Sequence, residues 1–594
     1  MRGSVGKVPY CWLSCFSITE PTMSRFARPF AEALAPLVEL PVADVEKQLE
    51  TPPKPGMGQL AFPCFQLAKT LRKAPPAIAE DLASKIQPTG LIKKVIATGP
   101  YVNAYLDGEA VAREVLPAAL EAGECFGSLS IGGGRAVTVD YSSPNIAKSF
   151  GIHHLRSTVI GHALVNMLKA AGFQPVGINH LGDWGTQFGQ LLAIWDEKGD
   201  EAELNERGIA YLLELYVEFN AAKEKNPELQ DVARAKFRLL ENGDAEARRL
   251  WALFRKVSLD EFERVYAMLG IQFDDMRGES FYEGLMPAVL TELKERNLLT
   301  ESKGATVVDL EAFDLGTALV RKADGSTLYL TRDLASAGYR KESYDFVRSL
   351  YVVGGSQALH FAQMTKVLEL MERPWFDTIE HVPFGLMRFK DRKMSTRKGD
   401  IVPLRDVLEQ AAALAKQTIV KGAEDKSRPI PDDVDELAHR IGVGAVVFND
   451  LKNRRVRDVV FDWDEVLAFD GETGPYLQYT AARIASMEAR YGKPPSADVD
   501  FHLLDGPGEL ALIVAISEMP DSLQRGLESC EPSYVSDKLL EIASLFSTLY
   551  SNRSWKVLSE DVALTDARML LAHGVRQALC NGLGWLGIPV PARM

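Results

Sequence analysis

A strand, a loop and a helix follow one another in the first third of the chain and constrain its fold more than any other feature. The run 136–139 is rich in β-branched residues, as in a buried parallel strand, and apolar residues recur at helical spacing over 155–168 before a stop at Gly172. Such a strand–loop–helix unit leaves unpaired N–H groups at the positive end of the helix, where a phosphate can bind. We therefore predict a parallel α/β sheet that binds a nucleotide beside His153 and His154.

A second segment, Lys393–Gly399, places three cations within six positions of a polar loop that ends in glycine. A loop of this kind can close over a polyphosphate. Taken alone, a histidine pair at a helix start is more often structural, and a run of Lys and Arg is usually a solvated face. The occurrence of both segments in this order favours a single nucleotide site.

Composition describes an ordinary globular chain. Its 594 residues are 46% hydrophobic and 25% charged, and this length suggests about four domains. No run approaches the roughly 18 consecutive apolar residues of a membrane span, so we expect no membrane partner and a cytoplasmic location. The six cysteines lack the paired spacing of a zinc site, so we expect reduced thiols and no zinc.

The formal net charge of −14 argues against a nucleic-acid partner, because Lys and Arg supply the phosphate contacts that dominate RNA affinity. Local charge is more informative in a large chain. Two basic islands, Lys452–Arg457 and Lys390–Lys398, can face RNA while the acidic surplus lies elsewhere. A solvated surface is the alternative for each island.

Six ordered segments resemble a known family. They are Ser142–Lys148, His154–Thr158, Gly182–Gly189, Tyr329–Leu334, Met394–Gly399 and Thr473–Tyr479. The helix start and the cationic loop resemble the paired signatures of class I aminoacyl-tRNA synthetases, His-x-Gly-His and Lys-Met-Ser-Lys-Ser. The other segments narrow the resemblance to arginyl-tRNA synthetases, and matches at Leu60–Lys69 and Leu586–Pro591 extend it over nearly the whole chain from about Met23.

The resemblance implies a Rossmann-type parallel-sheet catalytic domain, a small α/β N-terminal domain and an all-helical C-terminal anticodon-binding domain. We place the N-terminal domain, which would bind the tRNA elbow or D-loop, at 23–112. The catalytic domain follows at 126–404, with a helical insertion at about 195–300. The helical region at 405–594 contains a stem and then an anticodon-binding bundle from about 474. Residues 1–22 are either a leader or the result of a start site placed too far upstream, and we favour the second reading.

The expected elements within these domains can be given by residue range. In the N-terminal domain we expect helices at Phe26–Leu40 and Ala77–Ile86 and strands at Lys93–Thr98 and Tyr101–Leu106. The catalytic sheet is expected to start at Arg135 and to continue with Pro175–Asn179, Thr306–Leu310, Leu328–Leu330 and Ser349–Val353.

The reaction implied by the resemblance has two steps. The carboxylate of arginine attacks the α-phosphate of ATP, and a ribose hydroxyl at the 3′ end of tRNA then attacks the arginyl adenylate. Neither step needs a protein nucleophile, so catalysis should come from positioning and from stabilising charge on the phosphate oxygens. The implied partners are tRNA(Arg), L-arginine and ATP with Mg²⁺. We expect no tightly bound cofactor and a monomer.

The nucleotide residues follow from the two signatures. By resemblance, the catalytic residues are His154, Lys393, Lys148 and Lys398, and the ATP-binding residues are Gly151, His153, His154, Gly182, Asp183, His360, Met394 and Ser395. The chain departs from the family at His153, where a glycine usually stands, and at Gly151, where a histidine is common. The His153 ring either obstructs ATP, or Gly151 relaxes the turn enough to accommodate it.

A substrate guanidinium has five donors and no acceptor, so its pocket needs carboxylates that point inward. By resemblance, the arginine-binding residues are Asp140, Asn145, Tyr329, Asp333 and Gln357, and the tRNA-binding residues are Phe62, Gln66, Tyr476 and Tyr479. A pocket of this kind rejects lysine and citrulline. Two other functions remain open: an RNA-binding or regulatory relative that has lost adenylation, and another adenylating ligase with a related sheet.

Overall fold

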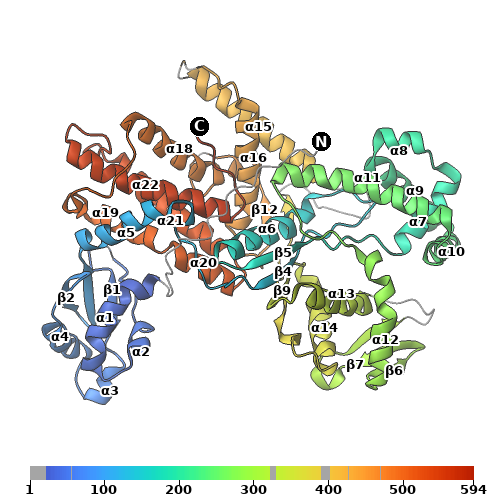
Figure 1. Ribbon diagram of the computed structural model, residues 1–594, viewed down its shortest axis with the longest axis horizontal. Coiled ribbons are helices and arrows are strands. Elements are labelled where there is room, and N and C mark those ends of the chain that lie inside the picture. The colour runs from blue at the N-terminus through green and yellow to red at the C-terminus, as the bar shows by residue number, and fades with distance from the viewer. Residues whose placement is uncertain are drawn as a thin grey trace.

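The computed structural model describes residues 22–54, 56–321, 329–389, 402–425, 427, 429–468 and 470–594. The loop Lys393–Gly399 and residues 1–21 lie outside these ranges, and so does Leu328. Within the described part, the chain forms an N-terminal α/β domain, a central parallel sheet with a helical insertion, and a mainly helical C-terminal region (Figure 1).

The N-terminal domain is built on an antiparallel sheet of order β1-β3-β2. Its strands are β1 (Leu60–Pro63), β2 (Ile92–Thr98) and β3 (Tyr101–Leu106), and its helices are α1 (Thr22–Val38), α2 (Val42–Glu46), α3 (Leu67–Leu71) and α4 (Pro75–Lys85). The two helices and two strands expected here are confirmed, and β1 adds a third strand. Helix α5 (Gly108–Ala122) then leads away from the domain and packs against the C-terminal helices.

The central sheet is parallel throughout, with strand order β10-β9-β4-β5. The strands are β4 (Ala136–Asp140), β5 (Gln174–Ile178), β9 (Arg348–Tyr351) and β10 (Ile379–His381). Helix α6 (Leu155–Ala170) connects β4 to β5, and α14 (Ala358–Leu370) connects β9 to β10. Strand β5 therefore lies on one side of β4, and β9 and β10, which come later in the chain, lie on its other side. This reversal creates a topological switch point at the carboxyl ends of β4 and β9, where doubly wound sheets bind ligands.

Two expected strands of this sheet are corrected. The segment Thr306–Leu310 belongs to a separate antiparallel sheet formed by β6 (Leu299–Ser302), β7 (Ala305–Asp309) and β8 (Thr317–Arg321). Its two-residue turn, Lys303 and Gly304, has both φ angles positive, at 50° and 78°, which favours a tight antiparallel hairpin over a parallel crossover. Tyr329 and Leu330 begin helix α13 (Tyr329–Tyr344), which buries apolar residues such as Leu330 and Leu334 together with the charged Arg340.

The helical insertion leaves the sheet after β5. Its helices are α7 (Thr186–Lys198), α8 (Glu201–Arg207), α9 (Ile209–Lys225), α10 (Leu229–Glu241) and α11 (Ala245–Leu269). Helix α11 ends at Gly270, whose φ of 69° forms a left-handed cap, and the chain then returns to the sheet edge through a bridge between Ile178 and Asp275. Helix α12 (Met286–Glu295) and the antiparallel sheet follow before α13.

The C-terminal region is helical, as expected, except for one short strand. Its helices are α15 (Leu404–Asp425), α16 (Val434–Leu451), α17 (Trp463–Val466), α18 (Gly474–Tyr491), α19 (Pro507–Ser517), α20 (Met519–Glu528), α21 (Ser533–Ser551) and α22 (Val562–Trp585). The exception is β12 (Val459–Phe461), which pairs in parallel with β11 (Met387–Phe389). Among the helices that the structure describes, none is long and apolar enough to cross a bilayer.

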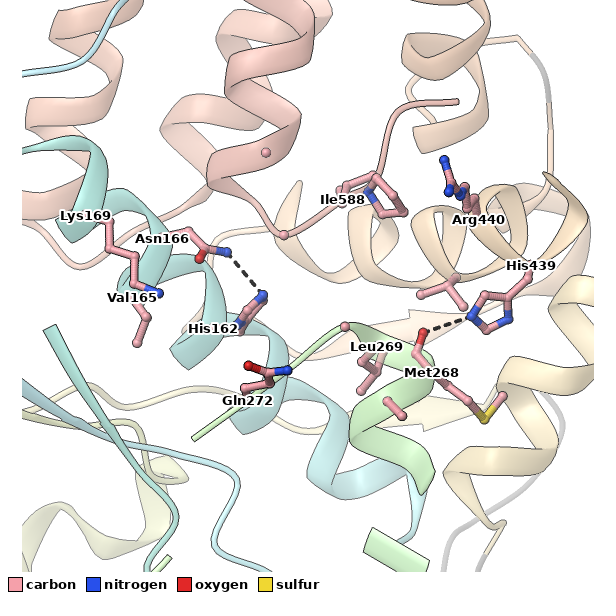
Figure 2. A pocket seen from close by; sticks show the side chains of 16 residues that line it. His162, Val165, Asn166, Lys169, Met268, Leu269, Gln272, His439, Arg440 and Ile588 are labelled. Carbon is pink, nitrogen blue, oxygen red and sulfur yellow. Dashed lines mark hydrogen bonds between the residues drawn. The ribbon is translucent and has the colours of Figure 1, made fainter. Parts of the chain in front are cut away.

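The second half of α6 faces a cavity of about 550 Å³ where this helix, the end of the insertion and the C-terminal region meet (Figure 2). Its lining includes His162 of α6 and His439 of α16, and the tail after α22 closes one side. Gly587 of that tail has a φ of 73°, and a Cβ there would lie 2.4 Å from the His162 ring. Only glycine therefore fits this contact, which fixes the C-terminal tail against α6.

Candidate active site

The loop after β4 has an unusual backbone. Ser142, Ser143 and Ala147 have φ angles of 71°, 45° and 60°, in the left-handed region that residues with a Cβ seldom adopt. The Ser142 N–H donates to Ser157 Oγ at 2.9 Å, and the Ser143 N–H donates to Asn179 Oδ1 at 3.2 Å. Strained residues of this kind gather at functional sites, where the surrounding contacts hold them in place.

The histidine pair lies where the loop enters α6. The ring of His154 stacks on Phe150 with centroids 5.1 Å apart and planes 10° apart, and the His153 ring lies 4.0 Å from that of His154. Burial lowers the pKa of His154 well below its usual value, and His153 and Lys148 act in the same direction. Burial and then Lys148 also lower the pKa of His153. Both rings are therefore neutral near pH 7 and can donate a hydrogen bond to a phosphate oxygen.

Gly151 adopts an ordinary extended conformation, with φ −87° and ψ 165°. This backbone is accessible to any residue, so the structure does not use the conformational freedom of glycine at this position. Of the two explanations for the departure from the family signature, a turn relaxed by Gly151 therefore has no support in the backbone geometry.

The segment that follows the cationic loop lies against the histidine signature. The Ile152 N–H donates to Val402 O at 3.0 Å, and the Leu404 N–H donates to Phe150 O at 2.8 Å. Gly151 and Pro403 form an antiparallel bridge between these bonds. The predicted residues Lys393, Met394, Ser395 and Lys398 lie outside the described residues.

Lys148 lies three residues after Asn145 in the loop, and Gly182 lies in the segment after β5. The half-buried Lys148 Nζ lies 5.5 Å from the Tyr216 ring centroid, and burial lowers its pKa. Gly182 forms a parallel bridge with Asn145, and a Cβ at Gly182 would lie 2.3 Å from Asn145 Oδ1. Glycine is thus required at position 182 for the segment after β5 to approach Asn145 this closely.

Asp183 is fully buried and its carboxylate bonds within the protein. It accepts hydrogen bonds from Arg255 Nε at 3.0 Å, the Ser280 N–H at 2.8 Å and Ser280 Oγ at 2.9 Å. Arg255 belongs to α11, so these bonds connect the insertion to the site. An ATP contact predicted for Asp183 would have to compete with these partners.

Asp333, predicted to bind arginine, pairs with His360, predicted to bind ATP, across α13 and α14. Asp333 Oδ2 lies 2.6 Å from His360 Nε2, and both side chains are 23% exposed. Tyr329, at the start of α13, is 65% exposed, and Gln357 is exposed just before α14. These four residues come from the two helices that flank the switch point, and their side chains are accessible to a ligand.

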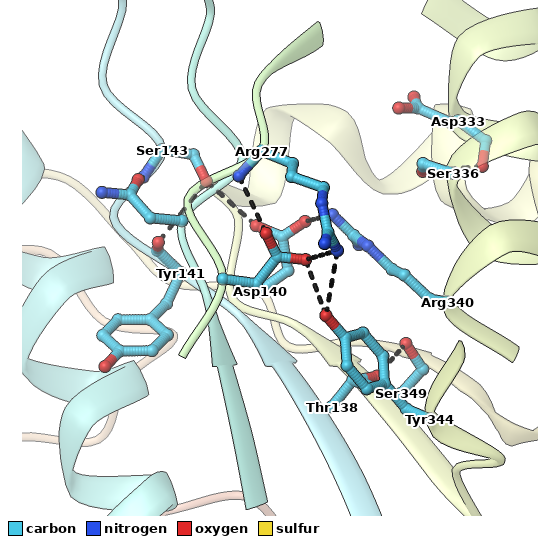
Figure 3. Close-up of polar contacts among 12 residues, drawn as sticks. Thr138, Asp140, Tyr141, Ser143, Arg277, Asp333, Ser336, Arg340, Tyr344 and Ser349 are labelled. Atoms are coloured by element: carbon cyan, nitrogen blue, oxygen red, sulfur yellow. Dashed lines mark hydrogen bonds and ion pairs between the residues drawn. The ribbon is translucent and has the colours of Figure 1, made fainter. Parts of the chain in front are cut away.

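Asp140 is held by partners of its own at the end of β4. Its Oδ2 lies 2.7 Å from Nη2 of the fully buried Arg340, and its Oδ1 accepts from Ser143 Oγ at 2.9 Å (Figure 3). The predicted carboxylate for the substrate is therefore already paired with an arginine of the chain. Arg340 lies seven residues after Asp333, two turns along α13, but this spacing does not reveal its pairing with Asp140 on β4.

A buried acidic residue, Glu279, was not predicted. Its Oε1 lies 3.2 Å from Arg332 Nη1, and Arg332 also donates to Glu283 at 3.2 Å. Burial raises the pKa of Glu279 to about 7, although Arg332 opposes the shift. Arg332 directly precedes Asp333, so these charges border the predicted arginine pocket. Glu279 lies 53 residues upstream of Arg332 in sequence number, which explains why no local pattern marked it.

The predicted tRNA-binding aromatics have different environments. Phe62 is fully buried in the N-terminal domain, whereas the neighbouring Phe65 is 53% exposed and packs edge-to-face on Tyr101. Gln66 is exposed. In the C-terminal region, Tyr476 and Tyr479 are both half-buried; Tyr476 OH bonds Ser547 Oγ at 2.9 Å and the Tyr479 ring lies 4.5 Å from the guanidinium of Arg483. On the N-terminal domain, Phe65 is thus better placed than Phe62 to meet RNA.

Two residues of the basic island Lys452–Arg457 make contacts within the protein. Arg455 donates to Pro383 O at 2.6 Å and to Cys530 O at 2.9 Å, and Arg454 lies over the Tyr534 ring at 4.1 Å. Arg455 thus joins the segment after β10 to the C-terminal helices. The other island, Lys390–Lys398, lies outside the described residues. Among those that are described, no three His, Cys, Asp or Glu side chains form a metal-binding group.

Comparison with known protein families shows to which family the chain belongs. The model of the class I (R) tRNA synthetase catalytic domain matches residues 116–463, which is more than half of the chain. The chain belongs to the arginyl-tRNA synthetase family. Models of the arginyl-tRNA synthetase N-terminal domain and of the DALR anticodon-binding domain match residues 24–106 and 477–594. The resemblance seen in the sequence is confirmed.

Relatives of the family match over nearly their full length. The arginine–tRNA ligase of Halothermothrix orenii is 44% identical over 570 residues, which span 95% of this chain and 100% of the relative. That of Clostridium beijerinckii is 46% identical over 564 residues, or 95% of this chain and 99% of the relative.

Solved structures of arginyl-tRNA synthetases share the fold. The Thermus thermophilus arginyl-tRNA synthetase superposes with a TM-score of 0.78 at 24% identity, covering 96% of this chain and 100% of that one. The Plasmodium falciparum arginyl-tRNA synthetase gives 0.73 at 24% identity, with 90% and 93% covered. The expected fold class, a parallel-sheet catalytic domain between a small N-terminal domain and a helical C-terminal domain, is confirmed.

Proposed function

We infer that the chain is an arginine–tRNA ligase, which activates L-arginine with ATP and transfers it to the 3′-terminal ribose of tRNA(Arg), releasing AMP and diphosphate. The inference rests on the family and on one structural observation. The histidine signature, the segment 402–404 and the Asp333–His360 pair converge on the switch point of one parallel sheet. An RNA-binding relative without adenylation has no need of this convergence.

In the first step, the α-phosphate of ATP would lie at the N-terminal end of α6. The neutral His154 would donate to a phosphate oxygen, and Lys148 would supply positive charge from the loop. We assign Lys393 and Lys398 to the β- and γ-phosphates, which ATP would bring as its magnesium complex. The nucleotide would be bordered by Gly151, His153, Gly182, Met394 and Ser395. His360 would lie near the adenosine, and Asp183 would hold the surrounding segments in place.

The arginine substrate would bind between α13 and α14. Asp333 would accept from the guanidinium with Tyr329 beside it, while the bond from His360 fixes one oxygen of that carboxylate. Asn145 and Gln357 would hold the amino and carboxylate groups of the substrate. Asp140 is paired with Arg340, so it would line the base of the pocket and would not act as a free carboxylate.

For tRNA, we propose that residues 23–112 contact the elbow through Phe65 and Gln66, and that the bundle from about 474 reads the anticodon with Tyr476 and Tyr479 near the RNA. Unstacked bases bind well on exposed aromatic faces. We also propose a monomer in the cytoplasm, as suits a translation enzyme with three domains on one chain.

The test is charging of total tRNA with labelled arginine, lysine or citrulline at equal concentrations. Arginine alone should be transferred, because lysine and citrulline leave the carboxylate pocket without its full set of charged donors. Transfer of another amino acid would identify a different adenylating ligase. Absence of any transfer, with tRNA still bound, would identify the regulatory relative.

A further inference from the structure

We propose that Ser258 and Tyr266, two residues of insertion helix α11, are positioning residues for the reaction. They hold the loop after β4 in the left-handed conformation that places Asn145 and Lys148. This proposal rests on the proposed function, since it assigns the insertion a part in the ligase reaction. Neither residue lies in any of the motifs that carry the family resemblance.

The loop needs external support. Ser142, Ser143 and Ala147 all have positive φ and none is a glycine, so the free chain would leave this conformation. Ala147 immediately precedes Lys148, and a change in its φ would redirect the lysine side chain. Whatever holds Ala147 therefore controls where Lys148 points.

Ser258 holds Ala147 directly. The buried Ser258 Oγ accepts a hydrogen bond from the Ala147 N–H at 2.9 Å. The same hydroxyl donates to Phe254 O at 2.8 Å, one turn earlier in α11. Because the hydroxyl proton is engaged by Phe254, an oxygen lone pair faces Ala147. Serine is unfavourable inside a helix unless its hydroxyl has such a use.

Tyr266 holds both ends of the same loop. Its hydroxyl lies 2.8 Å from Ser142 Oγ and accepts from Asn179 Nδ2 at 3.0 Å. Its ring packs edge-on against Phe150 at 5.3 Å, and Phe150 in turn stacks on His154. One side chain of the insertion thus contacts the start of the loop and supports the catalytic histidine.

The two residues act from one face of α11. Ser258 and Tyr266 lie eight positions apart with Phe262 midway, and Phe262 packs on Phe150 at 5.4 Å. The same helix is tied to the sheet domain by Arg255 and by Trp251, whose Nε1 donates to Asp183 O at 2.8 Å. Helix α11, which is anchored to the sheet domain by two residues, therefore determines the shape of the loop after β4.

The decisive experiment compares Ser258→Ala with Ser258→Thr in steady-state charging of tRNA with arginine. Ser258→Ala leaves the Ala147 N–H buried without an acceptor, and we expect kcat to fall about tenfold or more. The KM for tRNA should be unchanged. Ser258→Thr keeps the hydroxyl and should restore kcat to within about threefold of the native value. Tyr266→Phe keeps the ring but loses the hydroxyl and should also lower kcat.

The matched control is Ser486→Ala. Ser486 likewise donates to its own helix, at Ala482 O, but lies in α18 away from the loop, so its removal should leave kcat unchanged. A native enzyme that does not charge arginine would refute the proposed function, independently of the variants. The positioning role is refuted if Ser258→Ala retains native kcat, or if Ser258→Thr loses as much activity as alanine.

A second readout does not depend on activity. Amide hydrogen exchange of the segment 142–150 should be faster in Ser258→Ala than in the native chain, while exchange in β4 and α6 stays the same. Equal exchange of this segment in both proteins would overturn the proposal even if the reaction proved to be different.

Discussion

Arg156 Nε lies 2.9 Å from Asp450 Oδ2, and both side chains are only 1% exposed. Arg156 belongs to the helix that carries the histidine signature, and Asp450 belongs to α16 of the C-terminal region. The same guanidinium donates to Gly385 O at 2.8 Å and to Arg457 O at 2.7 Å. The buried Arg156 side chain thus joins α6 to the segments around β11 and β12. The catalytic and C-terminal regions therefore form one connected structure.

Removal of one partner of this ion pair should be strongly destabilising. Arg156→Ala leaves the Asp450 carboxylate buried without its counter-charge, and we expect the free energy of unfolding to fall by about 3–5 kcal/mol. Denaturant titration measures this loss. The control is Arg234→Ala, whose pair with Asp231 is exposed by 55% and 77% and should contribute less than about 1 kcal/mol. Equal losses in the two variants would refute a special role for the Arg156 pair.

Asp333→Asn should weaken arginine binding selectively. The variant keeps the shape of the side chain but loses the charge that would face the substrate guanidinium, so the KM for arginine should rise about tenfold to hundredfold. The KM for ATP should change little. Asp345→Asn is a matched control, because Asp345 is 91% exposed and pairs with Lys341 at the surface. An unchanged arginine KM in Asp333→Asn would exclude this residue from the pocket.

Glu279 should make stability depend on pH. Its pKa is raised from 4.5 to about 7, chiefly by burial, so its contribution to stability is fully present below pH 4.5 and is lost as the pH rises through about 7. The loss amounts to about 3 kcal/mol. Glu279→Gln removes this titration, so its free energy of unfolding should fall less over the same interval. The exposed Glu295→Gln serves as control, and an identical pH dependence of Glu279→Gln and the native chain would contradict the assignment.

Phe65→Ala should impair tRNA binding without affecting the small substrates. Loss of one exposed aromatic face should raise the KM for tRNA about tenfold, while the KM values for arginine and ATP stay constant. Phe62→Ala should instead destabilise the N-terminal domain by about 3–5 kcal/mol, because Phe62 is fully buried in its core. A tRNA KM that responds to neither change would place the elbow contact elsewhere.

Local pattern predicted strand β4 and helix α6 well. The β-branched run at β4 and the helical spacing of α6 are strong signals, and both elements are found within a residue or two of their expected limits. The antiparallel hairpin at β7 was placed in the wrong sheet, because a short apolar run does not reveal its pairing partner. The tight turn at Lys303 and Gly304, where both φ angles are positive, is what makes this segment part of an antiparallel hairpin.

Long-range partners were beyond reach of the sequence. Arg156 meets Asp450 at a separation of 294 residues, and Ser258 meets Ala147 at 111, so no local spacing links them. Asp140 was correctly placed at a strand end, yet its buried partner Arg340 depends on how α13 packs against β4. Such contacts are set by tertiary packing, which a single sequence does not display.

The most direct measurement is charging of tRNA(Arg) with labelled arginine by His154→Ala beside the native enzyme, with the exposed His502→Ala as control. If His154 donates to the transition-state phosphate, the variant should lose at least about a hundredfold in rate, while His502→Ala and tRNA binding remain native. A His154→Ala enzyme that charges arginine at the native rate would contradict the placement of catalysis at the start of α6.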